Sequence, residues 1–398
     1  MTGPNWLMRL VRALGLGVLV VAVWPSAAGA ATWSIQPTSG PTGATDSYLG
    51  GVSCTSARSC IAVGGYETAS GAYTLAEHWN GTKWYVQHTP NPSGVKNSNL
   101  EAVSCTSARS CVAVGSYANA GDTVGFTLVE SWNGTSWSIQ HSPNPLGAKV
   151  SFLAGVSCTS AQNCVAVGNS GNATSTIGHT LAERWNGTRW SLQHTPNPTG
   201  AEDSTLGAVS CTSARSCTAV GLSGTPTSYT GYTLAERWNG TNWSIQTTPN
   251  PPSGTDEQHY LNGVSCISAR SCTAVGQYET ASGTVSLVER WNGTSWSAVH
   301  SPDPAGADYA ELGAVSCTSA QSCIAIGVTD IGKNPDHGFA ERWNGTSWTV
   351  QHTPAPKGAA YSDLNAVSCS TEQGCTAVGT FGRSISEHAP IRTLAERY

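Results

Sequence analysis

The sequence has little charge. Only 11% of its 398 residues are Asp, Glu, Lys or Arg, and the formal net charge is −5. A nucleic-acid-binding protein needs a basic surface, and an interaction tail needs a run of like charges. Neither is present, so we expect no nucleic-acid partner.

The sequence also lacks the short motifs of common catalytic and metal sites. It has no H-E-x-x-H, no C-x-x-C, no phosphate-binding G-x-x-x-x-G-K-[ST], no G-x-G-x-x-G and no EF-hand loop. We therefore predict no catalytic residue, no metal and no cofactor from sequence.

Long apolar runs are absent except near the start. Arg9 and Arg12 precede the apolar stretch 13–24, and Ala28-Gly29-Ala30 fits a cleavage site. This order is typical of a signal peptide, so we predict a signal peptide over residues 1–30 and one domain over 31–398. The alternative is an uncleaved anchor, for which about a dozen apolar residues are short. We expect a secreted or cell-surface protein with no membrane span after cleavage.

A repeat fills the rest of the chain. Each copy reads L-x-x-V-S-C, five residues, C-x-A-[VI]-G, a variable loop and L-[AV]-E-R-W or a variant of it; in six copies N-G-T-x-W follows. Seven copies occur, and their first cysteines lie 51 to 55 residues apart. A period near 50 is typical of propeller blades and other repeat arrays.

Each copy predicts four short strands. In the fourth copy we place them at 206–211, 217–221, 232–238 and 243–246, since small, β-branched and aromatic residues dominate there. Asn-Gly separates the last two strands in six copies, which predicts a tight turn. These positions are Asn80, Asn133, Asn186, Asn239, Asn292 and Asn344. They are also N-G-T glycosylation sequons, but the turn alone explains their repetition.

The paired cysteines predict disulfides. In an exported chain thiols oxidise, and a five-residue hairpin loop places its flanking residues opposite each other. The predicted pairs are Cys54–Cys60, Cys105–Cys111, Cys158–Cys164, Cys211–Cys217, Cys266–Cys272, Cys317–Cys323 and Cys369–Cys375. The alternative is zinc, but no His stands at a fixed offset from the cysteines.

The two ends of the chain complement each other. The seventh copy stops at the end of its third strand, while residues 33–36 read Trp-Ser-Ile-Gln, as in the fourth strand of other copies. Together they make one full unit if the chain closes into a ring. We predict an all-β, seven-bladed β-propeller of four-stranded blades, closed by the N-terminal strand pairing into the last blade.

The chain resembles exported bacterial β-propeller repeat proteins over its whole mature length. The architecture is loosely similar to Kelch and galactose-oxidase-type propellers and to the Asp-box sialidase-like group. The W-N-G-T-x-W turn resembles an Asp-box, but Asn replaces the acid and the Trp comes one residue earlier; the Kelch double glycine is missing. The resemblance therefore implies an architecture and no activity.

One charged residue recurs in every copy, on the third strand. It is Glu77, Glu130, Glu183, Glu236, Glu289, Glu341 and Glu396. It shares a strand face with the Leu two before it. We interpret it as a structural tie between blades, with backbone N–H groups, a Trp indole or the hairpin arginines (Arg58, Arg109, Arg215 and Arg270) as partners.

The loops on one face vary between copies, so we place binding there. The candidate residues are Tyr66, Tyr117, Tyr229, Tyr278, His259, Asp330, His337, Arg383 and His388. Aromatic and polar loop residues suit contact with a sugar or a protein. The expected function is a monomeric binding or scaffold propeller for an extracellular carbohydrate or protein. The alternatives are a glycosidase- or lyase-type enzyme with its site at the central channel mouth, and a purely structural envelope protein.

Overall fold

The computed structural model describes residues 32–398 except 122, 173–177, 226–229, 252–257, 332–333 and 387–388, and it does not describe the side chains of 334–336. Thr32–Tyr398 forms one compact unit. The described part contains 28 strands and no helix. None of its residues therefore form a helix that is long and apolar enough to cross a membrane.

Each of repeats 1 to 6 contributes strands a, b, c and d in chain order. In repeats 1 to 3 these are β2 Asp46–Ser56, β3 Ser59–Thr68, β4 Gly71–Trp79, β5 Trp84–Gln87; β6 Ser98–Ser107, β7 Ser110–Ala118, β8 Gly125–Trp132, β9 Trp137–Gln140; β10 Val150–Ser160, β11 Asn163–Gly171, β12 Gly178–Trp185 and β13 Trp190–Gln193. In repeats 4 to 6 they are β14 Asp203–Ser213, β15 Ser216–Thr225, β16 Thr230–Trp238, β17 Trp243–Gln246; β18 His259–Ser268, β19 Ser271–Thr280, β20 Gly283–Trp291, β21 Trp296–Val299; β22 Ala307–Ser319, β23 Ser322–Ile331, β24 Asn334–Trp343 and β25 Trp348–Gln351. Repeat 7 has β26 Tyr361–Thr371, β27 Gly374–Gly382 and β28 Ile391–Arg397, and β1 Ser34–Gln36 pairs antiparallel with β28.

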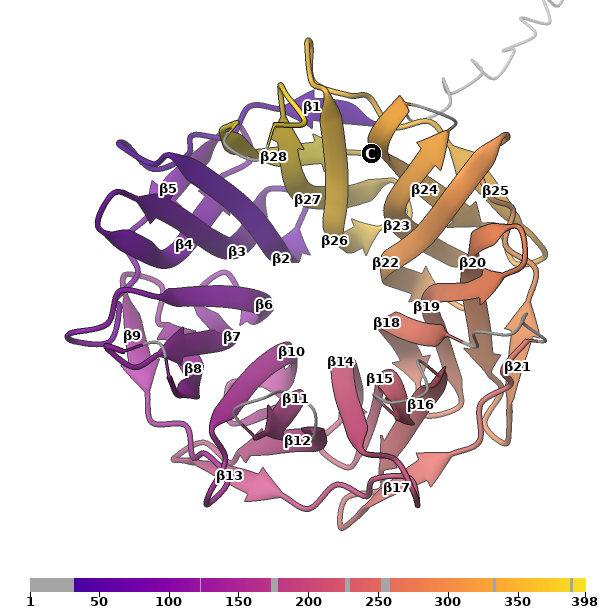
Figure 1. Ribbon diagram of the computed structural model, residues 1–398, viewed down its shortest axis with the longest axis horizontal. Helices are drawn as coiled ribbons and strands as arrows, with labels where there is room; N and C mark the ends of the chain where they lie inside the picture. The colour runs from indigo at the N-terminus through magenta and orange to yellow at the C-terminus, as the bar shows by residue number, and fades with distance from the viewer. Residues whose placement is uncertain are drawn as a thin grey trace, which may run out of the picture. The chain divides into compact units, whose positions relative to one another are not determined.

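The sheets are antiparallel and are arranged around a central opening. The a strands lie nearest the opening and the d strands lie at the outside (Figure 1). This is a β-propeller-like arrangement, as the sequence predicted. The strands extend beyond the predicted ranges; for example, β14 and β15 remain paired as far as Asp203 and Gly224.

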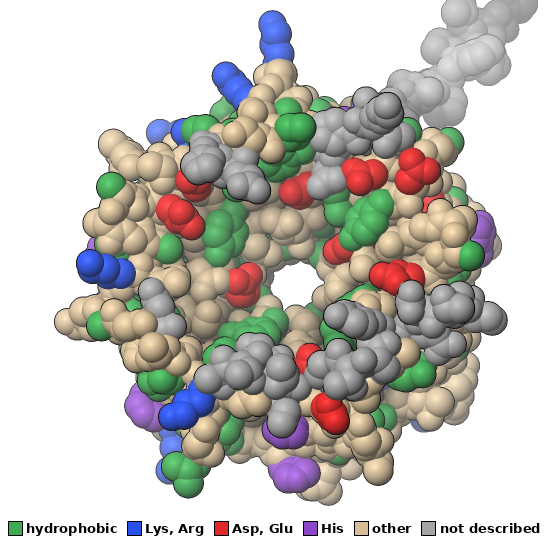
Figure 2. Space-filling model, viewed as in Figure 1, with side chains coloured by type: hydrophobic (Ala, Val, Ile, Leu, Met, Phe, Trp, Pro, Cys, Tyr) green, Lys and Arg blue, Asp and Glu red, His purple; other side chains and the backbone are tan. Residues whose placement is uncertain are grey.

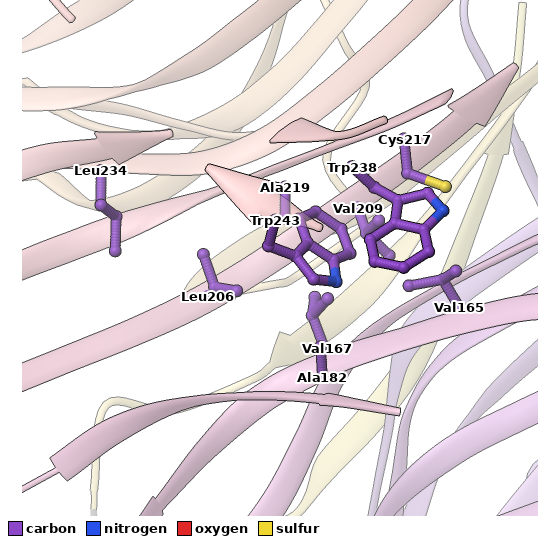
Figure 3. Close-up of a cluster of buried hydrophobic side chains, with 10 residues drawn as sticks. All are labelled: Val165, Val167, Ala182, Leu206, Val209, Cys217, Ala219, Leu234, Trp238 and Trp243. Carbon is purple, nitrogen blue, oxygen red and sulfur yellow. The ribbon is translucent and has the colours of Figure 1, made fainter. Parts of the chain in front are cut away.

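The core lies between neighbouring sheets. Figure 3 shows Val165, Val167 and Ala182 of repeat 3 packed against Leu206, Trp238 and Trp243 of repeat 4. The same kind of cluster joins Val378 and Ala395 of repeat 7 to Leu49 and Trp79 of repeat 1. Because each sheet buries its apolar residues against its neighbours, a single repeat has no core of its own.

A hydrogen bond from every repeat to the next accompanies this packing. The Ser of V-S-C accepts a bond from the backbone N–H of the following repeat's first Cys, at 2.9–3.0 Å. The acceptors are Ser53, Ser104, Ser157, Ser210, Ser265, Ser316 and Ser368, and Ser368 accepts from Cys54 of repeat 1. This repeated Ser therefore joins neighbouring inner strands, a role that the sequence did not reveal.

The predicted disulfides are confirmed. All seven pairs join directly opposite residues of strands a and b, and no Cys of the described chain is free. A bridge across so short a loop is worth roughly 2 kcal/mol on the chain-entropy model.

The repeated Glu of strand c lies buried between sheets, as predicted for a tie between blades. The Ser142 hydroxyl of repeat 2 donates to Glu183 of repeat 3 at 2.8 and 2.9 Å. Ser301 of repeat 5 donates to Glu341 of repeat 6 at 2.7 Å. In these two contacts the side-chain partner is a hydroxyl on the preceding repeat, rather than a cation.

The predicted partners of these glutamates are wrong in two respects. Trp190 Nε1 donates to the Gln140 amide oxygen at 2.8 Å instead of to a carboxylate. The Arg58 side chain lies against Gly81 in the turn between strands c and d. The sequence shows which strand face the Glu shares, but it does not show which neighbour meets it.

Candidate functional site

The inner strands present their most variable residues to the central opening. In each a strand the repeated Leu is buried between sheets, for example Leu49 and Leu364, at 0% and 3% exposure. Because side chains alternate along a strand, the residues before and after this Leu face the other way. A cavity of about 180 Å³ within the opening is lined by residues from all seven a strands, including Gly50, Glu101 and Asn262.

A larger cavity of about 480 Å³ gathers four of the repeats at one side of the opening. Repeats 1, 2, 6 and 7 line it with Tyr48, Gly50, Glu101, Glu311, Gly313, Gly327, Val328, Asp363, Leu364 and Asn365. Figure 2 shows acidic side chains around the opening on this face. The lining contains three carboxylates and a phenol and includes no Lys or Arg among the residues that the structure describes.

The topology places this cavity on the variable face. Asp363 lies near the start of β26, just after a d–a connection, and Val328 lies near the end of β23, just before a b–c connection. The b–c and d–a connections leave from the same end of the sheets. The cavity therefore opens on the face where binding was predicted, although inner-strand residues form much of it.

Burial affects the acidity of Asp363. It raises the pKa of this carboxyl, with the nearby Glu311 and Asp330 adding to the rise, while Thr380 and His337 act in the opposite direction. Thr380 donates a hydrogen bond to Asp363 Oδ2 at 3.4 Å. The Oδ1 atom is buried and has no hydrogen-bond partner within the described residues.

Glu101 and Tyr48 form the opposite side of the cavity. Burial raises the pKa of Glu101, and the Asn99 amide, which donates to its Oε1, acts in the opposite direction. Burial and then the charge of Glu101 raise the pKa of Tyr48 to about 12. The Tyr48 hydroxyl therefore stays protonated at neutral pH and is a hydrogen-bond donor.

Glu311 completes the acidic lining. Its Oε2 accepts a hydrogen bond from the Tyr309 hydroxyl, whose oxygen also lies 3.2 Å from Gln277 Oε1. The cavity thus combines the Tyr48 hydroxyl, a donor, with several carboxylate acceptors held on strands. Such a lining suits a polyhydroxylated ligand.

Two of the predicted site residues lie beside this cavity. His337 on β24 is opposite Thr329 on β23, and Asp330 is the next residue of that strand. Both interact electrostatically with Asp363. The structure therefore brings Asp330 and His337 to the same region as the cavity.

Three of the four predicted tyrosines, Tyr66, Tyr117 and Tyr278, are half-buried at the ends of b strands, away from this cavity. Tyr66 contacts Tyr73 with ring centroids 5.6 Å apart, and Tyr117 stacks on Phe126 at 5.2 Å. Tyr117 lines a different cavity, of about 560 Å³, near His141. These tyrosines and Tyr278 also pack against the cores between sheets.

His259 was predicted to contact a ligand, but the structure buries it to 1% exposure. Its Nε2 lies 2.8 Å from the Pro251 carbonyl and its Nδ1 lies 3.3 Å from the Gly231 carbonyl. Its ring stacks on Tyr278, with centroids 5.9 Å apart. A ring enclosed in this way holds neighbouring segments together and is not exposed to a ligand.

The remaining predicted residues are separate from the cavity lining. Arg383 is exposed in the b–c connection of repeat 7. Tyr229 and His388 lie outside the described residues. Within the described chain, no group of three or more His, Cys, Asp or Glu residues is suited to a metal ion.

Four lining residues were missed from the sequence: Tyr48, Glu101, Glu311 and Asp363. A signal was present, because they occupy the two positions beside the repeated Leu of strand a, where the seven copies differ most. Strand a was treated as repeated framework, and the search was confined to the loops.

Comparisons with known proteins find similarity only at the level of fold. No family model matches the chain, and no curated protein matches it. A polysaccharide lyase, an ulvan lyase solved with bound GlcA(1-4)Rha3S, has a TM-score of 0.52 at 10% identity, over 84% of this chain and 89% of that one. A lectin in complex with α-methyl fucoside has a TM-score of 0.45 at 13% identity, over 78% and 97%. A xyloglucanase from Xanthomonas campestris has a TM-score of 0.30 at 12% identity, over 84% of this chain and 53% of that one. The likeness to the lyase shows a β-propeller-like fold.

Proposed function

We propose that this chain is an exported, seven-bladed β-propeller that binds carbohydrate at the mouth of its central channel. Contacts between repeats 7 and 1 support a closed ring. Ser368 accepts from the Cys54 backbone at 2.9 Å, and the Asn365 amide donates to the Leu49 carbonyl at 3.0 Å. The pairing of β1 with β28 supports the N-terminal strand as the outer strand of the last blade.

The observation that carries the binding proposal is the 480 Å³ cavity. Its polar residues are the ones in which the inner strands of the repeats differ from one another. A framework needs the same residue in every blade, so residues that differ and converge on one cavity are candidates for recognition.

The charge of the lining favours neutral or amino sugars. Carboxylates accept hydrogen bonds from sugar hydroxyls and pair with ammonium groups. Glu101, Glu311 and Asp363 would repel a uronate or a sulfate ester, and no Lys or Arg of the described lining would offset this repulsion. We therefore propose a neutral or amino-sugar glycan as the ligand.

A second candidate function is glycoside hydrolysis at the same place. Glycosidases pair a carboxylic acid of raised pKa with a carboxylate. Burial raises the pKa of Asp363, and Glu311 lies near enough to add to the rise. Turnover of a polysaccharide at this cavity would favour this enzyme function over binding alone.

Export is supported by the cysteines and by the N-terminal sequence. All fourteen cysteines form disulfides, which persist in oxidising compartments. Residues 1–30 have the order of regions of a signal peptide. We propose an extracellular or cell-surface location for the propeller.

Glycan-array binding by residues 31–398 tests the proposal. We expect neutral or amino-sugar oligomers to bind, and Asp363→Asn or Glu311→Gln to weaken binding at least tenfold. Glu372→Gln, in the exposed a–b hairpin of repeat 7, is the matched control and should bind normally. Binding that survives both cavity substitutions would place the ligand elsewhere, and selective binding of a protein would replace the carbohydrate proposal.

A further inference from the structure

An arginine at the end of strand c contacts an aromatic ring of the next repeat. The guanidinium carbon lies 4.6–5.9 Å from the ring centroid in five such contacts. They are Arg184 on Trp238, Arg237 on Trp291, Arg290 on Trp343, Arg342 on Tyr398 and Arg397 on Trp79. These are cation–π contacts between neighbouring repeats.

In these contacts the guanidinium often has a second partner, a backbone carbonyl in the a–b hairpin of the next repeat. Arg290 donates to the Ala320 carbonyl at 2.9 Å, and the Trp343 indole donates to the same oxygen at 3.1 Å. Arg397 and Trp79 share the Ala57 carbonyl in the same way, at 2.6 and 3.3 Å. The ring face and the carbonyl together form a receptor for a planar, multiply donating cation.

Repeat 3 has this receptor without its arginine. The preceding repeat carries Ser131 where five other repeats carry Arg and repeat 1 carries His78. The Trp185 indole still donates to the Ala161 carbonyl, at 3.1 Å. Trp185 is only half-buried, whereas Trp79, Trp238, Trp291 and Trp343 are 4–8% exposed.

The surroundings of Trp185 differ in a way that favours an incoming cation. Four other hairpins carry an arginine at the position that packs against the c–d turn glycine, but repeat 3 has Gln162 there. The Ser131 side chain is short, and its hydroxyl lies 3.2 Å from the Ser138 hydroxyl. Trp132 of repeat 2 also receives no arginine from the preceding repeat, because repeat 1 has another residue at that position. In repeat 2, however, Arg109 of the a–b hairpin lies against Gly134 of the adjacent turn.

We propose that the Trp185 ring face and the Ala161 carbonyl, where Ser131 stands in place of the usual arginine, form a docking site for an arginine side chain of a partner protein. The chain itself places a guanidinium in five equivalent positions, which identifies the occupant that this geometry accepts. Lysine presents a compact ammonium that lacks the planar fork needed to stack and donate together. The site lies on the a–b and c–d hairpin face, so it is separate from the channel mouth and independent of the carbohydrate proposal.

Titration of the ¹⁵N-tryptophan-labelled protein with N-acetyl-arginine amide tests this site by NMR. The Trp185 indole N–H signal, assigned by its loss in Trp185→Phe, should shift with arginine. It should shift at least tenfold less with the isosteric, uncharged N-acetyl-citrulline amide. Ser131→Arg should abolish the response, because the chain's own guanidinium would then occupy the Trp185 site. Ser131→Gln adds a side chain without a charge and should retain the response.

The remaining tryptophan signals report whether each variant is folded. Arginine occurs at the Ser131 position in five other repeats, so Ser131→Arg should fold. An equal response to citrulline, or an arginine response unchanged in Ser131→Arg, would overturn the proposal. A response as strong to N-acetyl-lysine amide would replace the guanidinium site by a general cation site and would likewise overturn it.

Discussion

The buried glutamates of strand c determine how the protein responds to pH. Both carboxylate oxygens of Glu236 and of Glu289 are buried, and none of these four atoms has a hydrogen-bond partner among the described residues. Burial raises the pKa of Glu236 from its ordinary value of 4.5 to about 8, and the Thr180 hydroxyl of the preceding repeat only partly opposes the rise. Burial likewise raises the pKa of Glu289 to about 8. These groups are therefore protonated in the folded protein at neutral pH.

This charge state predicts a fall in stability as pH rises. Between pH 4.5 and about 8 the folded protein holds a proton on Glu236 that the unfolded chain has released, so the free energy of unfolding decreases as pH rises through that range. Glu236→Gln stays uncharged at every pH. We expect this variant to exceed the native protein in stability at pH 8.5 by on the order of 1 kcal/mol, and to show no such gain at pH 5.

Urea unfolding at the two pH values measures this difference. Glu372→Gln removes an exposed carboxylate and should leave the pH dependence unchanged. A native protein that becomes more stable from pH 5 to pH 8.5, with no benefit from Glu236→Gln, would show that the buried glutamates are ionised.

Individual residues were predicted less well than the fold. The sequence places Glu236 on the face shared by Leu234, which the structure confirms by burying both. It could not show that Thr180, more than fifty residues earlier, would be its neighbour. Glu311 and Asp363 were missed for a related reason, because the packing of neighbouring sheets, which neither repeat encodes alone, brings inner strands of repeats 6 and 7 to one cavity.

The turn between strands c and d repeats with nearly the same geometry in six copies. In repeat 3, Asn186 Oδ1 accepts hydrogen bonds from Thr188 N, Thr188 Oγ1 and Arg189 N at 2.8–3.0 Å. Gly187 has a φ of 95°, in the left-handed region that favours glycine. Asn and Gly are therefore both required by the turn, whether or not the sequon carries a sugar.

Substitution at Asn186 separates the turn from glycosylation. Asn186→Ala removes the acceptor of three hydrogen bonds and should destabilise the protein by about 1 kcal/mol. Asn186→Asp also destroys the sequon but keeps a side-chain oxygen acceptor, so its stability should stay close to native. Thermal unfolding of the two unglycosylated proteins measures this; equal losses would mean that the side-chain oxygen does not stabilise the turn.

Elements were predictable where local chemistry determines them. Paired cysteines, the Asn-Gly turn and the Trp-x-x-Gln strand fix the hairpin face, and β17 has the predicted bounds Trp243–Gln246. The strand ends that point toward the opposite, variable face were predicted too short. Their sequences differ between repeats and carry no repeated pattern. The pairing of Leu222–Thr225 with Thr230–Thr233 continues the regular pairing of the preceding part of the same two strands.

At the scale of the whole molecule, the N-terminal segment belongs to the folded body. Trp33 is 6% exposed and contacts Tyr398, with ring centroids 5.3 Å apart. Ser39, which follows β1, donates its backbone N–H to Glu77 of repeat 1 at 3.4 Å. This segment therefore links the last and first repeats.

Truncating Trp33 should weaken the protein as much as a core mutation. Trp33→Ala deletes a buried ring and should cost roughly 3 kcal/mol in the free energy of unfolding, measured by denaturant titration. Ile35→Ala, in the same strand at 36% exposure, should cost much less. Native-like stability of Trp33→Ala would show that the N-terminal segment is a loose tail and would contradict the proposed ring closure.

The fold follows from a repeated sequence, but the site follows from departures from it. The matching fragments at the two ends predicted the pairing of β1 with β28, which the structure contains. The position of the cavity depends on the arrangement of all the inner strands, which no single repeat encodes. Comparing the variable positions of strand a across all seven repeats would have found Tyr48, Glu101, Glu311 and Asp363.

A crystal structure of residues 31–398 with the best-binding neutral or amino-sugar oligomer tests the central claim most directly. We predict sugar density in the cavity, with hydroxyl or amino groups within hydrogen-bonding distance of Asp363, Glu311 or Glu101. Density only on the outer d strands or on the a–b and c–d hairpin face would contradict the claim that the channel mouth is the binding site.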